Sequence, residues 1–524
     1  MKPVAPNRVE PRSSSPADDG VIVVGAGVGG LACAIDLARS GCRVRVLEQR
    51  PQPGGKARVV RPGSLGVDAG PTVLTMAWVF DELFDAAGAD FRAAVSLERA
   101  AVLARHAWPD GVRLDLFDDA ARTRDAIGAT FGAAEARAYD AFRAQTRRIY
   151  AISEPHFIRA QRLTLPGIVK RFGARGLATL ASLDSHRTMW AALSKRFAEP
   201  KLRQLFGRYA TYTGSSPFEA PATLNLVAHV ESEGVYRAAG GIGAVVRAMT
   251  DLARSLGVEV LAGRPVERIV VERGRAVGVV SRGEHLPARA VVFNGDVSAI
   301  GGGLLGAEAA RAVPPTPRAL RSLSAITWAM EARPTGFPLL HHNVFFGPRY
   351  REEFEDIFDR GRAPEEPTVY VCAQDRGDEP GERGLERVLV IVCAPANGDR
   401  PERWGPAERE RCTRAMEAAL RRVGSTLAPE AQRVTTPVEF AALFPGTGGA
   451  LYGPRSKGAR SVLARRGAKT KLPGLYLAGG SVHPGAGVPM ATLSGRLAAE
   501  RIRADLVSTG RSPRAATTGT ISTS

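Results

Sequence analysis

The sequence predicts an α/β fold in which a domain built on a parallel sheet is interleaved with a mixed α+β domain and a helical region. Two observations support this prediction. A glycine-rich turn follows an apolar run near the start of the chain, and further glycine-rich turns recur near residues 240 and 480, each followed by a helical pattern. The length of 524 residues exceeds what one ordinary hydrophobic core holds, so two or more domains, or one large interrupted domain, are expected.

The first predicted element is a buried parallel strand at residues 21–24, followed by glycines with the spacing G-x-G-x-x-G. In such a turn Gly25 makes the tight bend, Gly27 lets backbone N–H groups approach a pyrophosphate, and Gly30 allows close packing of helix on strand. The motif alone is weak, because the chain contains 57 glycines. The residues of this turn expected to contact a dinucleotide are Gly25, Ala26, Gly27, Gly29 and Gly30.

The surroundings of this turn supply the rest of a βαβ unit. Apolar residues recur at helical spacing over 31–38, Gly41 closes that helix, and residues 44–47 form a second strand. The second strand ends in Glu48, 18 residues after Gly30, where a carboxylate accepts hydrogen bonds from the hydroxyls of an adenosine ribose. The unit therefore predicts a dinucleotide site that includes Glu48 and its neighbour Gln49. A glycine-rich packing turn without a ligand is the alternative.

A second glycine pair, Gly54-Gly55, follows the βαβ unit and is itself followed by Lys56. A nicotinamide-binding domain has no need of this pair, although an ordinary turn between strands would explain it in isolation. Together with Glu48 and the first turn, it resembles the GG-doublet flavoprotein superfamily, in which the pair lets the chain pass close to FAD. The resemblance implies FAD as the cofactor, held in a Rossmann-like domain of the amine-oxidase type.

Longer segments resemble the carotenoid desaturases of bacterial type. They are 67–89 (VDAGPTVLTMAWVFDELFDAAGA), 236–249 (YRAAGGIGAVVRAM), 341–358 (HHNVFFGPRYREEFEDIF) and 475–502, which contains LAGGSVHPGAGVPM. The segment 341–358 is characteristic of carotenoid desaturases and is poorly explained by the wider superfamily. The resemblance covers about residues 20–505, and its two ends are the most specific.

The same resemblance implies further contacts with FAD. The last segment reads as a strand ending at Gly479, a glycine-rich loop and a helix that starts near Val488, and in the family this helix points its N-terminus at the flavin ring. Many amine-oxidase relatives carry an acidic residue in that loop, where this chain has Gly480-Ser481, so contact is expected from backbone N–H groups and the Ser481 hydroxyl. The further residues implied in FAD binding are Gly70, Pro71, Val266, Gly480, Ser481, Val488, Pro489 and Met490.

The cofactor domain is expected to be assembled from separated pieces, because each piece carries its own FAD motif. These pieces are 20–100, 231–298 and 441–507. Between them, 101–230 is helical in pattern and is expected to form a helical substrate or membrane region, whereas 299–440 mixes strands and helices as a substrate domain. The two ends, 1–19 and 508–524, are polar and without periodicity and are expected to be disordered tails.

Individual elements follow from periodicity. Residues 258–280 alternate as paired strands with turns at Gly263 and Gly274. The clearest helix of the helical region is 135–152. In the substrate domain, 387–395 reads as a strand and 406–423 as a helix.

The charge balance favours anionic partners. The formal net charge is +18, and only eight of the 71 basic residues are lysines, so arginine dominates the surface. The basic residues are spread along the chain without a recognisable nucleic-acid module, and aromatic residues make up only 6%, so nucleic-acid binding is not expected. A lipid headgroup layer is the other anionic partner considered, and a solvated basic surface is the alternative.

Cysteine usage and hydropathy indicate the compartment. The five cysteines are odd in number and form no C-x-x-C pair, so neither a disulfide framework nor a thiolate metal site is expected. Residues 1–19 lack the apolar core of a secretory signal, and the longest apolar stretch, 21–38, contains the glycine turn and Asp36, so no spanning helix is expected. A cytoplasmic protein with peripheral membrane contact is therefore expected.

The desaturase resemblance implies removal of two hydrogens from adjacent carbons of an apolar chain, one as hydride to the flavin and one as a proton. His483, in the glycine-rich loop beside the flavin, is the best candidate for taking the proton, with a structural histidine, water or the reduced flavin as alternatives. His341-His342 is the only close histidine pair, and the sequence shows no carboxylate or cysteine accompanying it, so no metal site is expected. The electron acceptor stays open between a quinone and O₂.

Two segments resemble one subfamily in particular. GPTVLTMAWVFDELF (70–84) and ARHAWPDGVRLDLF (104–117) are similar to the 1-hydroxycarotenoid 3,4-desaturases, also called methoxyneurosporene dehydrogenases. This similarity implies a double bond introduced at C3–C4 of an acyclic carotenoid hydroxylated or methoxylated at C1, as in the spheroidene and spirilloxanthin routes of phototrophic bacteria. The alternatives are a phytoene desaturase, a GG-doublet oxidase of amines or porphyrinogens, and a non-enzymatic prenyl-lipid-binding module.

A segment that begins at Pro166 is predicted to form an amphipathic helix in a membrane interface. Its basic side carries Lys170, Arg171 and Arg175, which would meet anionic lipid while the apolar side dips below the headgroups. A helix packed on the protein's own core is the alternative. The apolar side consists of Ile168, Val169, Phe172, Leu177, Leu180 and Leu183.

Overall fold

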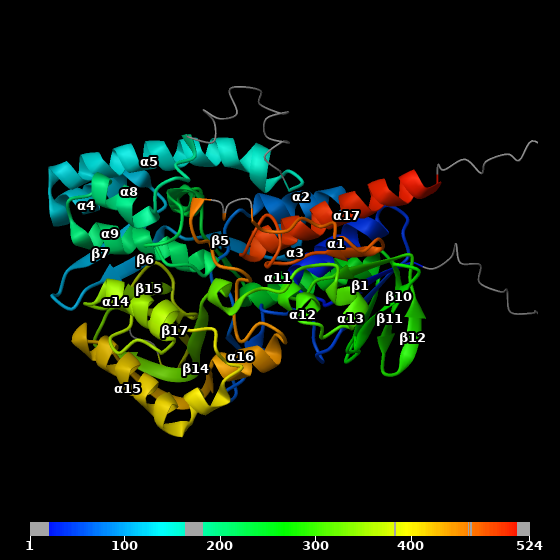
Figure 1. Ribbon diagram of the computed structural model, residues 1–524. Coiled ribbons are helices and arrows are strands. Elements are labelled where there is room, and N and C mark those ends of the chain that lie inside the picture. The colour runs from blue at the N-terminus through cyan, green and yellow to red at the C-terminus, as the bar shows by residue number, and fades with distance from the viewer. Residues whose placement is uncertain (1–19, 163–181, 382–383, 460, 462–463, 511–524) are drawn as a thin grey trace, which may run out of the picture.

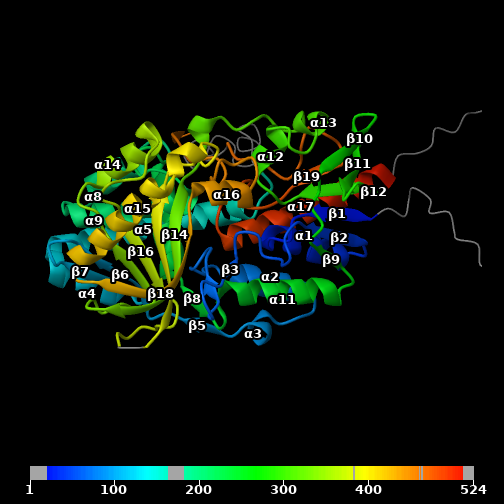
Figure 2. The same ribbon diagram turned by 90° about the horizontal axis from the view of Figure 1, so that it is seen from below.

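The structure, a computed structural model, describes residues 20–162, 182–381, 384–459, 461 and 464–510. Two large β-sheets lie side by side, one of five strands and one of seven, and helices cover both (Figure 1). Seen from below, the strands of the seven-stranded sheet lie on the left and those of the five-stranded sheet on the right (Figure 2).

The five-stranded sheet is parallel throughout and draws its strands from distant parts of the chain. In spatial order its strands are β19 (Leu475–Leu477), β13 (Ala290–Phe293), β1 (Val21–Val24), β2 (Val44–Glu48) and β9 (Glu259–Ala262). The middle strands are near-continuous apolar runs because both faces of the sheet are covered. The predicted βαβ unit is therefore confirmed, with β1 and β2 as its strands.

Helices cover one face of this sheet: α1 (Val28–Ala38), α2 (Trp78–Ala86), α11 (Gly241–Ser255) and α17 (Val488–Gly510). The helix predicted from Val488 is confirmed, and its residues Leu493, Leu497 and Ile502 are buried as expected. It runs to Gly510, past the expected start of the C-terminal tail at residue 508. On the other face lie the small sheet β10 (Arg268–Glu272), β11 (Arg275–Ser281) and β12 (Glu284–Pro287), with α12 (Val297–Gly301) and α13 (Ala307–Ala310).

The expectation of paired strands over 258–280 is wrong for its first strand. β9 pairs in parallel with β2 in the large sheet, and the turn at Gly263 leads away from that sheet instead of closing a hairpin. The strands β10 and β11 do form an antiparallel hairpin, with Gly274 in its turn. Alternation predicts a strand but not its partner. Here α11 is the crossover that returns the chain to the parallel sheet.

The seven-stranded sheet lies between helices on both faces. Its strands, in spatial order, are β18 (Thr426–Thr435), β14 (Ser324–Thr335), β17 (Glu386–Ala394), β16 (Val369–Ala373), β15 (His342–Phe345), β6 (Val102–Ala107) and β7 (Arg113–Phe117). In Figure 1, α15 (Pro406–Arg422) lies below it, and α4 (Ala120–Phe131), α5 (Ala133–Ser153), α8 (Met189–Arg196) and α9 (Pro200–Gly207) lie above it. The elements predicted at 135–152, 387–395 and 406–423 correspond to α5, β17 and α15.

The helical expectation for 101–230 is wrong for its first part. β6 and β7 form an antiparallel hairpin, and β6 pairs in parallel with β15, so this part extends the seven-stranded sheet. The turn Pro109-Asp110-Gly111 between alternating runs was the available signal for a hairpin. Helices dominate only from residue 120 onward.

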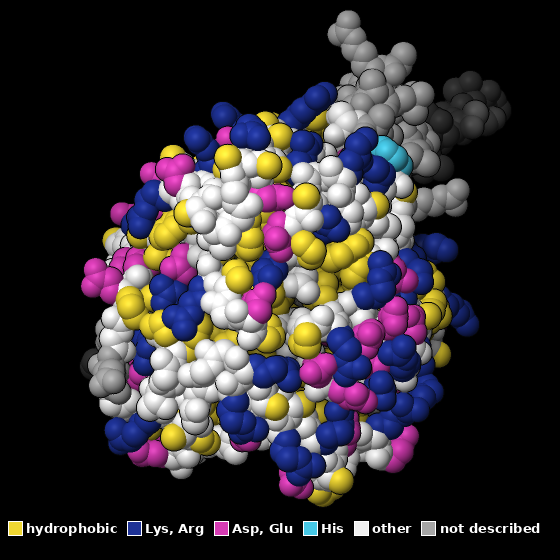
Figure 3. All heavy atoms as spheres, turned by 90° about the vertical axis from the view of Figure 1, so that its left-hand side faces the viewer, with side chains coloured by type: hydrophobic (Ala, Val, Ile, Leu, Met, Phe, Trp, Pro, Cys, Tyr) yellow, Lys and Arg dark blue, Asp and Glu magenta, His cyan; other side chains and the backbone are white. Residues whose placement is uncertain are grey.

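Shorter elements complete the described chain. They are β3 (Val59–Val60), β4 (Val67–Asp68), α3 (Phe91–Ala94), β5 (Leu97–Arg99), α10 (Leu226–Ser232), β8 (Tyr236–Ala238), α14 (Tyr350–Glu355) and α16 (Pro437–Leu443). None of the described helices combines the length and apolar composition needed to cross a membrane. On the face drawn in Figure 3, basic, acidic and apolar side chains are intermixed among the coloured residues, so the positive charge forms no separate basic patch there.

Candidate functional site

A cavity of about 910 Å³ lies at the carboxyl ends of β1, β2 and β13. Ligands of open α/β sheets bind at this edge, and the volume is near the upper end of the range for small-molecule sites, roughly 300–1,000 Å³. The lining continues to Leu183, Val227 and Thr327, so the cavity extends from the parallel sheet to the seven-stranded sheet and its helices.

The glycine turn forms one wall of the cavity. Gly25 has a φ of 99°, a conformation that favours glycine, and Gly27 is the residue directly before α1. Gly30 packs against the turn, because a Cβ there would lie 2.2 Å from the Gly25 carbonyl oxygen. Gly25, Gly27 and Gly29 line the cavity, whereas Ala26 and Gly30 are buried behind them and are not among the lining residues.

Glu48 is buried at the end of β2 and lines the same cavity. Its carboxylate accepts hydrogen bonds from the amides of Ala26 at 2.8 Å and Arg50 at 3.0 Å. These bonds tie the glycine turn to the second strand. A carboxylate offers about four lone-pair sites, so acceptor capacity is left for ribose hydroxyls.

The glycine doublet passes beside the glycine turn. Gly54 forms a bridge with Gly27 and donates its amide to the Ala26 carbonyl at 2.9 Å. Gly54 and Gly55 have φ values of 136° and 60°, so both positions favour glycine. Gly70 lies behind the doublet, where a Cβ would be 2.0 Å from the Lys56 carbonyl oxygen. The two glycine motifs therefore meet at one place in the cavity wall.

Two polar groups beside the glycine turn have acceptor atoms to offer. Asn294 follows β13, and its Nδ2 donates to the Gly25 carbonyl at 3.1 Å. Its Oδ1, and the Oδ2 of Asp296, are buried without a hydrogen-bond partner among the described residues. Both residues line the cavity, and unpaired buried oxygens are expected where a ligand supplies the donors. With the exposed turn amides and Glu48, this wall fits a dinucleotide.

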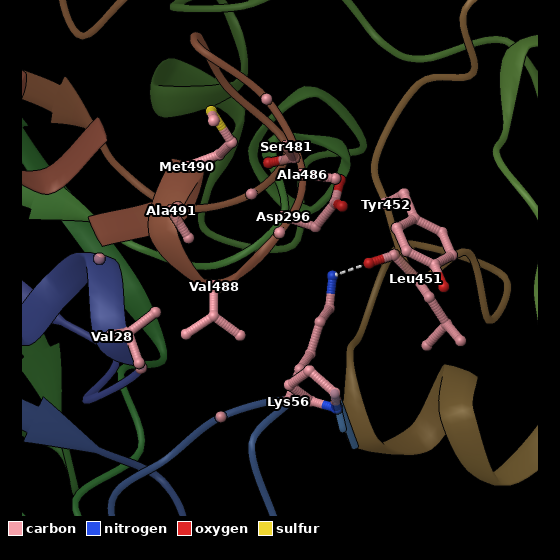
Figure 4. Close-up of a pocket in the computed structure, with 18 of the residues that line it drawn as sticks. Val28, Lys56, Asp296, Leu451, Tyr452, Ser481, Ala486, Val488, Met490 and Ala491 are labelled. Carbon is pink, nitrogen blue, oxygen red and sulfur yellow. Dashed lines mark hydrogen bonds between the residues drawn. The ribbon is translucent and has the colours of Figure 1, made fainter. Parts of the chain in front are cut away.

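Lys56 crosses the cavity beyond the doublet (Figure 4). Its Nζ donates a hydrogen bond to the Leu451 carbonyl, and Val488 and Met490 of α17 line the same space, to the left of Lys56 in this view. Burial lowers the pKa of Lys56, while the negative charge of Asp296 opposes this effect. The ammonium group is therefore a buried donor in the part of the cavity next to α17.

The loop before α17 and the first turn of that helix form the opposite wall. Gly480, Ser481, Val488, Pro489 and Met490 all line the cavity, as the resemblance implied. The Ser481 hydroxyl accepts a hydrogen bond from the Val297 amide at 3.1 Å, so it also joins this loop to α12. The N-terminus of α17 points its free amides and partial positive charge toward this space.

His483 also lines the cavity, from within the same loop. Its Nε2 lies 2.9 Å from the Ala160 carbonyl oxygen, and its own amide donates to the Arg466 carbonyl. Burial lowers the pKa of His483, and the carbonyls of Ala160 and Phe157 raise it in part. Backbone groups thus hold the ring in place. This arrangement is compatible with a structural role for a neutral imidazole and with a catalytic one.

Most of the predicted cofactor residues meet in this one cavity. Apart from Ala26 and Gly30, every predicted residue lines it. The lining residues among them that have not been described above are Gln49, Pro71 and Val266, and Gly55 and Gly70 of the doublet region line the cavity as well. The sequence places Asn294 and Asp296 at the end of the segment 288–300, which resembles the family's strand leaving the cofactor domain, but neither residue was among those expected to bind the cofactor. The prediction also missed Arg208, Tyr212 and Glu231, which no local pattern distinguishes.

The statement that His341-His342 has no cysteine beside it is wrong. Cys372 on β16 lies opposite His342 on β15, and its Sγ is 3.6 Å from His341 Nε2. Ligand atoms of all three residues lie within 4.8 Å of one another. Cross-strand pairing brings them together from positions thirty residues apart in the sequence. Burial raises the pKa of the Cys372 thiol to about 12, which opposes thiolate formation.

The predicted amphipathic helix lies outside the described residues, except for its last two positions, 182 and 183. Leu183 is buried and lines the cavity. The membrane contact of Lys170, Arg171 and Arg175 therefore stays a prediction from the sequence.

Known proteins resemble this chain along nearly its whole length. A family model described as flavin containing amine oxidoreductase matches residues 28–503. Hydroxyneurosporene desaturase of Rubrivivax gelatinosus is 49% identical over 508 residues, covering 96% of this chain and 97% of that protein. The hydroxyneurosporene desaturase of Cereibacter sphaeroides is 44% identical, covering 94% and 99%. A 4,4'-diapolycopene oxygenase of Methylomonas sp is 30% identical, covering 93% and 98%.

Solved structures resemble the fold. An oxidoreductase from Methanosarcina mazei has a TM-score of 0.56 at 16% identity, covering 92% of this chain and 99% of that one. Cyclohexylamine oxidase from Brevibacterium oxydans has a TM-score of 0.55 at 16% identity, covering 94% and 100%. At such identity the likeness shows the fold alone, and it confirms the predicted amine-oxidase type. The chain therefore belongs to the flavin containing amine oxidoreductase family, as an FAD-dependent member of its carotenoid desaturase branch.

Proposed function

We propose that this chain introduces the C3–C4 double bond into acyclic carotenoids that carry a hydroxyl or methoxyl group at C1. One observation carries the proposal: three hydroxyneurosporene desaturases are 41–49% identical to this chain over at least 94% of its length. Their name specifies a hydroxylated carotenoid as the molecule that is desaturated. The subfamily resemblance of segments 70–84 and 104–117 supports the same substrate and the same bond.

The described residues support the binding part of this proposal. The glycine turn, Glu48, the doublet and the first turn of α17 would hold FAD. Bound FAD supplies a hydride acceptor for an allylic carbon. Beyond the FAD residues, apolar side chains such as Leu226, Val227 and Val230 line the cavity. They would hold the carotenoid chain in place and keep water from the reacting carbons.

The proton acceptor is proposed to be His483. It lines the cavity in the loop that leads into α17, and its lowered pKa favours the neutral imidazole, which is the form that can accept a proton. The hydrogen bond to Ala160 would then fix the orientation of the ring. The alternative is that His483 has a structural role only.

Other functions are less well supported. Amine oxidation is favoured by the family description and by solved structures of 16% identity, whereas the relatives of 41–49% identity are named as desaturases. A non-enzymatic lipid-binding module would have no need of the glycine turn, Glu48 and doublet that meet at the cavity. Phytoene desaturation stays the second candidate, since it uses the same cofactor and the same type of reaction.

The proposal includes a membrane surface, because the substrate dissolves in lipid. We expect peripheral contact from the cytoplasmic side, assisted by anionic lipid. A quinone in the same membrane or O₂ would reoxidise the flavin.

The test uses the FAD-loaded protein with carotenoids embedded in liposomes. A 1-hydroxy and a 1-methoxy acyclic carotenoid should be converted to products whose absorption is shifted to longer wavelength, while phytoene should remain unchanged. Conversion of phytoene without activity on either oxygenated carotenoid would contradict the proposal and favour phytoene desaturation.

A further inference from the structure

A polar cluster interrupts the apolar lining of the cavity. Arg208 and Tyr212 come from one short 3₁₀ helix (Arg208–Thr213), and Glu231 comes from α10. All three line the cavity, together with Val227 and Val230 from the same helix as Glu231. We call these three side chains the Arg208 network.

The members of the network interact with one another. The Tyr212 hydroxyl lies within interaction range of both Arg208 and Glu231. The Tyr209 hydroxyl, behind the cavity wall, donates a hydrogen bond of 2.6 Å to Glu231 Oε2. The Arg208 guanidinium lies over the rings of Tyr212 and Tyr370, with its central carbon 5.7 and 5.3 Å from the ring centroids. Burial raises the pKa of Glu231, and hydrogen bonds from the tyrosines and the charge of Arg208 lower it in part.

Fold stability alone does not explain a guanidinium at this position. Among the described residues no carboxylate forms an ion pair with Arg208. The groups that act on its guanidinium are Tyr212, Tyr370 and Cys393, and only the Tyr212 hydroxyl is hydrogen-bonded to it. A buried charge is unfavourable unless hydrogen bonds satisfy it, and an arginine carries five N–H donors. A ligand oxygen in the cavity would satisfy donors that the described protein groups leave available.

We propose that the Arg208 network binds the oxygen atom at C1 of the carotenoid end group, and that it thereby selects oxygenated substrates. This inference rests on the proposed function. Arg208 and Tyr212 can donate to the oxygen of either a hydroxyl or a methoxyl group. Glu231 can accept a hydrogen bond from a hydroxyl but gains nothing from a methoxyl group. The network therefore recognises both end groups and distinguishes them through Glu231.

The position of the network suits a reaction at C3–C4. Arg208 lies close enough to Tyr452 to oppose the rise that burial causes in the pKa of that tyrosine. Tyr452 follows Leu451, to whose carbonyl Lys56 donates, and lines the same cavity as the first turn of α17 (Figure 4). C1 is only a short stretch of chain away from C4, so an anchored C1 oxygen keeps the reacting carbons in this part of the cavity. The network would thus fix the register of the carotenoid.

The test compares a 1-hydroxy acyclic carotenoid, its 1-methoxy form and the hydrocarbon that lacks the oxygen. Equilibrium binding to the FAD-loaded protein and kcat/KM in liposomes are both measured. Tyr212→Phe should weaken binding and kcat/KM for the oxygenated pair roughly tenfold, and Arg208→Met roughly a hundredfold, with little effect on the hydrocarbon. Glu231→Gln should lower kcat/KM for the 1-hydroxy carotenoid roughly fivefold more than kcat/KM for the 1-methoxy carotenoid.

Tyr139→Phe is the matched control, because it removes a buried tyrosine hydroxyl that does not line the cavity. It should keep the wild-type preference. Arg208→Lys should recover part of the loss seen in Arg208→Met, since it restores a cationic donor. FAD content and melting temperature show which variants are folded.

Equal losses on the oxygenated carotenoids and the hydrocarbon, or no loss in Tyr212→Phe and Arg208→Met, would overturn the inference. Failure of the proposed function looks different, since the wild-type protein would then convert none of the oxygenated carotenoids. In that case the binding measurement still decides: equal wild-type affinity for the hydroxylated carotenoid and the hydrocarbon would overturn the network as an oxygen site.

Discussion

Gly495 of α17 lies directly against Gly29 of α1, so closely that a Cβ at Gly495 would be 2.0 Å from the Gly29 carbonyl oxygen. One turn earlier, a Cβ at Gly29 would be 2.7 Å from the carbonyl oxygen of Ala491. The first turns of both helices line the cavity. A contact that only glycine permits therefore holds the two helix N-termini close together at the cavity.

Gly495→Ala should separate α1 from α17, because the added methyl group meets backbone atoms that have no room to move. We expect a destabilisation of roughly 2 kcal/mol and partial loss of bound FAD. Melting temperature and flavin absorbance measure the two effects. Gly128→Ala in α4 is the control: its Cβ would meet Ala136 at an acceptable 3.4 Å, and it should stabilise the helix slightly. A Gly495→Ala protein as stable as wild type would contradict the packing argument.

Gly27→Val should abolish retention of FAD. The new side chain would stand in the glycine turn, with its Cβ 3.1 Å from Asn294 Nδ2, where the pyrophosphate is expected. Flavin absorbance per protein after purification is the measurement. Gly405→Val serves as the control, since a Cβ there would meet nothing within 4 Å and its φ is −64°. Full FAD occupancy in Gly27→Val would contradict the assignment of this turn to the cofactor.

Glu353→Gln should change how stability depends on pH. Burial raises the pKa of Glu353 from 4.5 to about 7, and hydrogen bonds from Thr368 oppose that rise. The folded state therefore holds a proton that the unfolded state has released between these values, so stability falls as pH rises through this window. The variant should gain at most roughly 3 kcal/mol over wild type by pH 8, and little at pH 5. Urea unfolding across this range measures the difference.

The control for this titration is Glu417→Gln on α15, where the side chain is half exposed. It makes the same chemical change at a half-exposed position and so reports the effect of the substitution itself. A stability difference for Glu353→Gln that is constant across this pH range would mean that the Glu353 carboxyl does not titrate with folding.

His483→Gln should lower kcat roughly a hundredfold while FAD content stays near wild type, if His483 takes the proton. Single-turnover reduction of the flavin by embedded carotenoid is the measurement. His106→Gln is the matched control, because His106 is also buried and bonded to a backbone carbonyl, Leu114, but lies outside this cavity. A fall in melting temperature and FAD content without a specific loss of kcat would assign His483 a structural role.

Charge reversal of Lys170, Arg171 and Arg175 to Glu tests the predicted membrane helix, which lies outside the described residues. Binding to anionic liposomes should fall, since each basic residue near such a surface contributes on the order of 1 kcal/mol. The control reverses Arg254, Arg414 and Arg421, which are exposed on α11 and α15 and change the net charge equally. Equal liposome binding by both triple variants would contradict a membrane contact by the segment 166–183.

The spacing of residues along the chain was enough to predict most of the residues of the first βαβ unit that line the cavity. Gly25, Gly27 and Glu48 are set by the geometry of a single βαβ unit, and that geometry repeats wherever the unit binds a dinucleotide. The start of α17 was predictable for a similar reason, because a glycine-rich loop and a buried helical face adjoin in the sequence. In both places the site residues are near neighbours along the chain.

Contacts between distant segments were not predictable in the same way. The partner of β9, the joining of β6 to β15, and the approach of Cys372 to His341 all depend on strand order, which no local pattern contains. Arg208 and Glu231 lie in a stretch whose helical pattern is ordinary, and only the folded chain turns both toward the cavity.

The strand order of the parallel sheet also governs how the chain can fold as it is synthesised. β1 emerges from the ribosome early, whereas β19, which pairs with β13, is made some 450 residues after β1. At typical rates of translation this delay is on the order of tens of seconds. Throughout that time the glycine turn exists without the helix that completes its cavity. Flavin capture therefore has to follow synthesis of nearly the whole polypeptide, and until then the first strands of the parallel sheet lack part of the sheet in which they are buried.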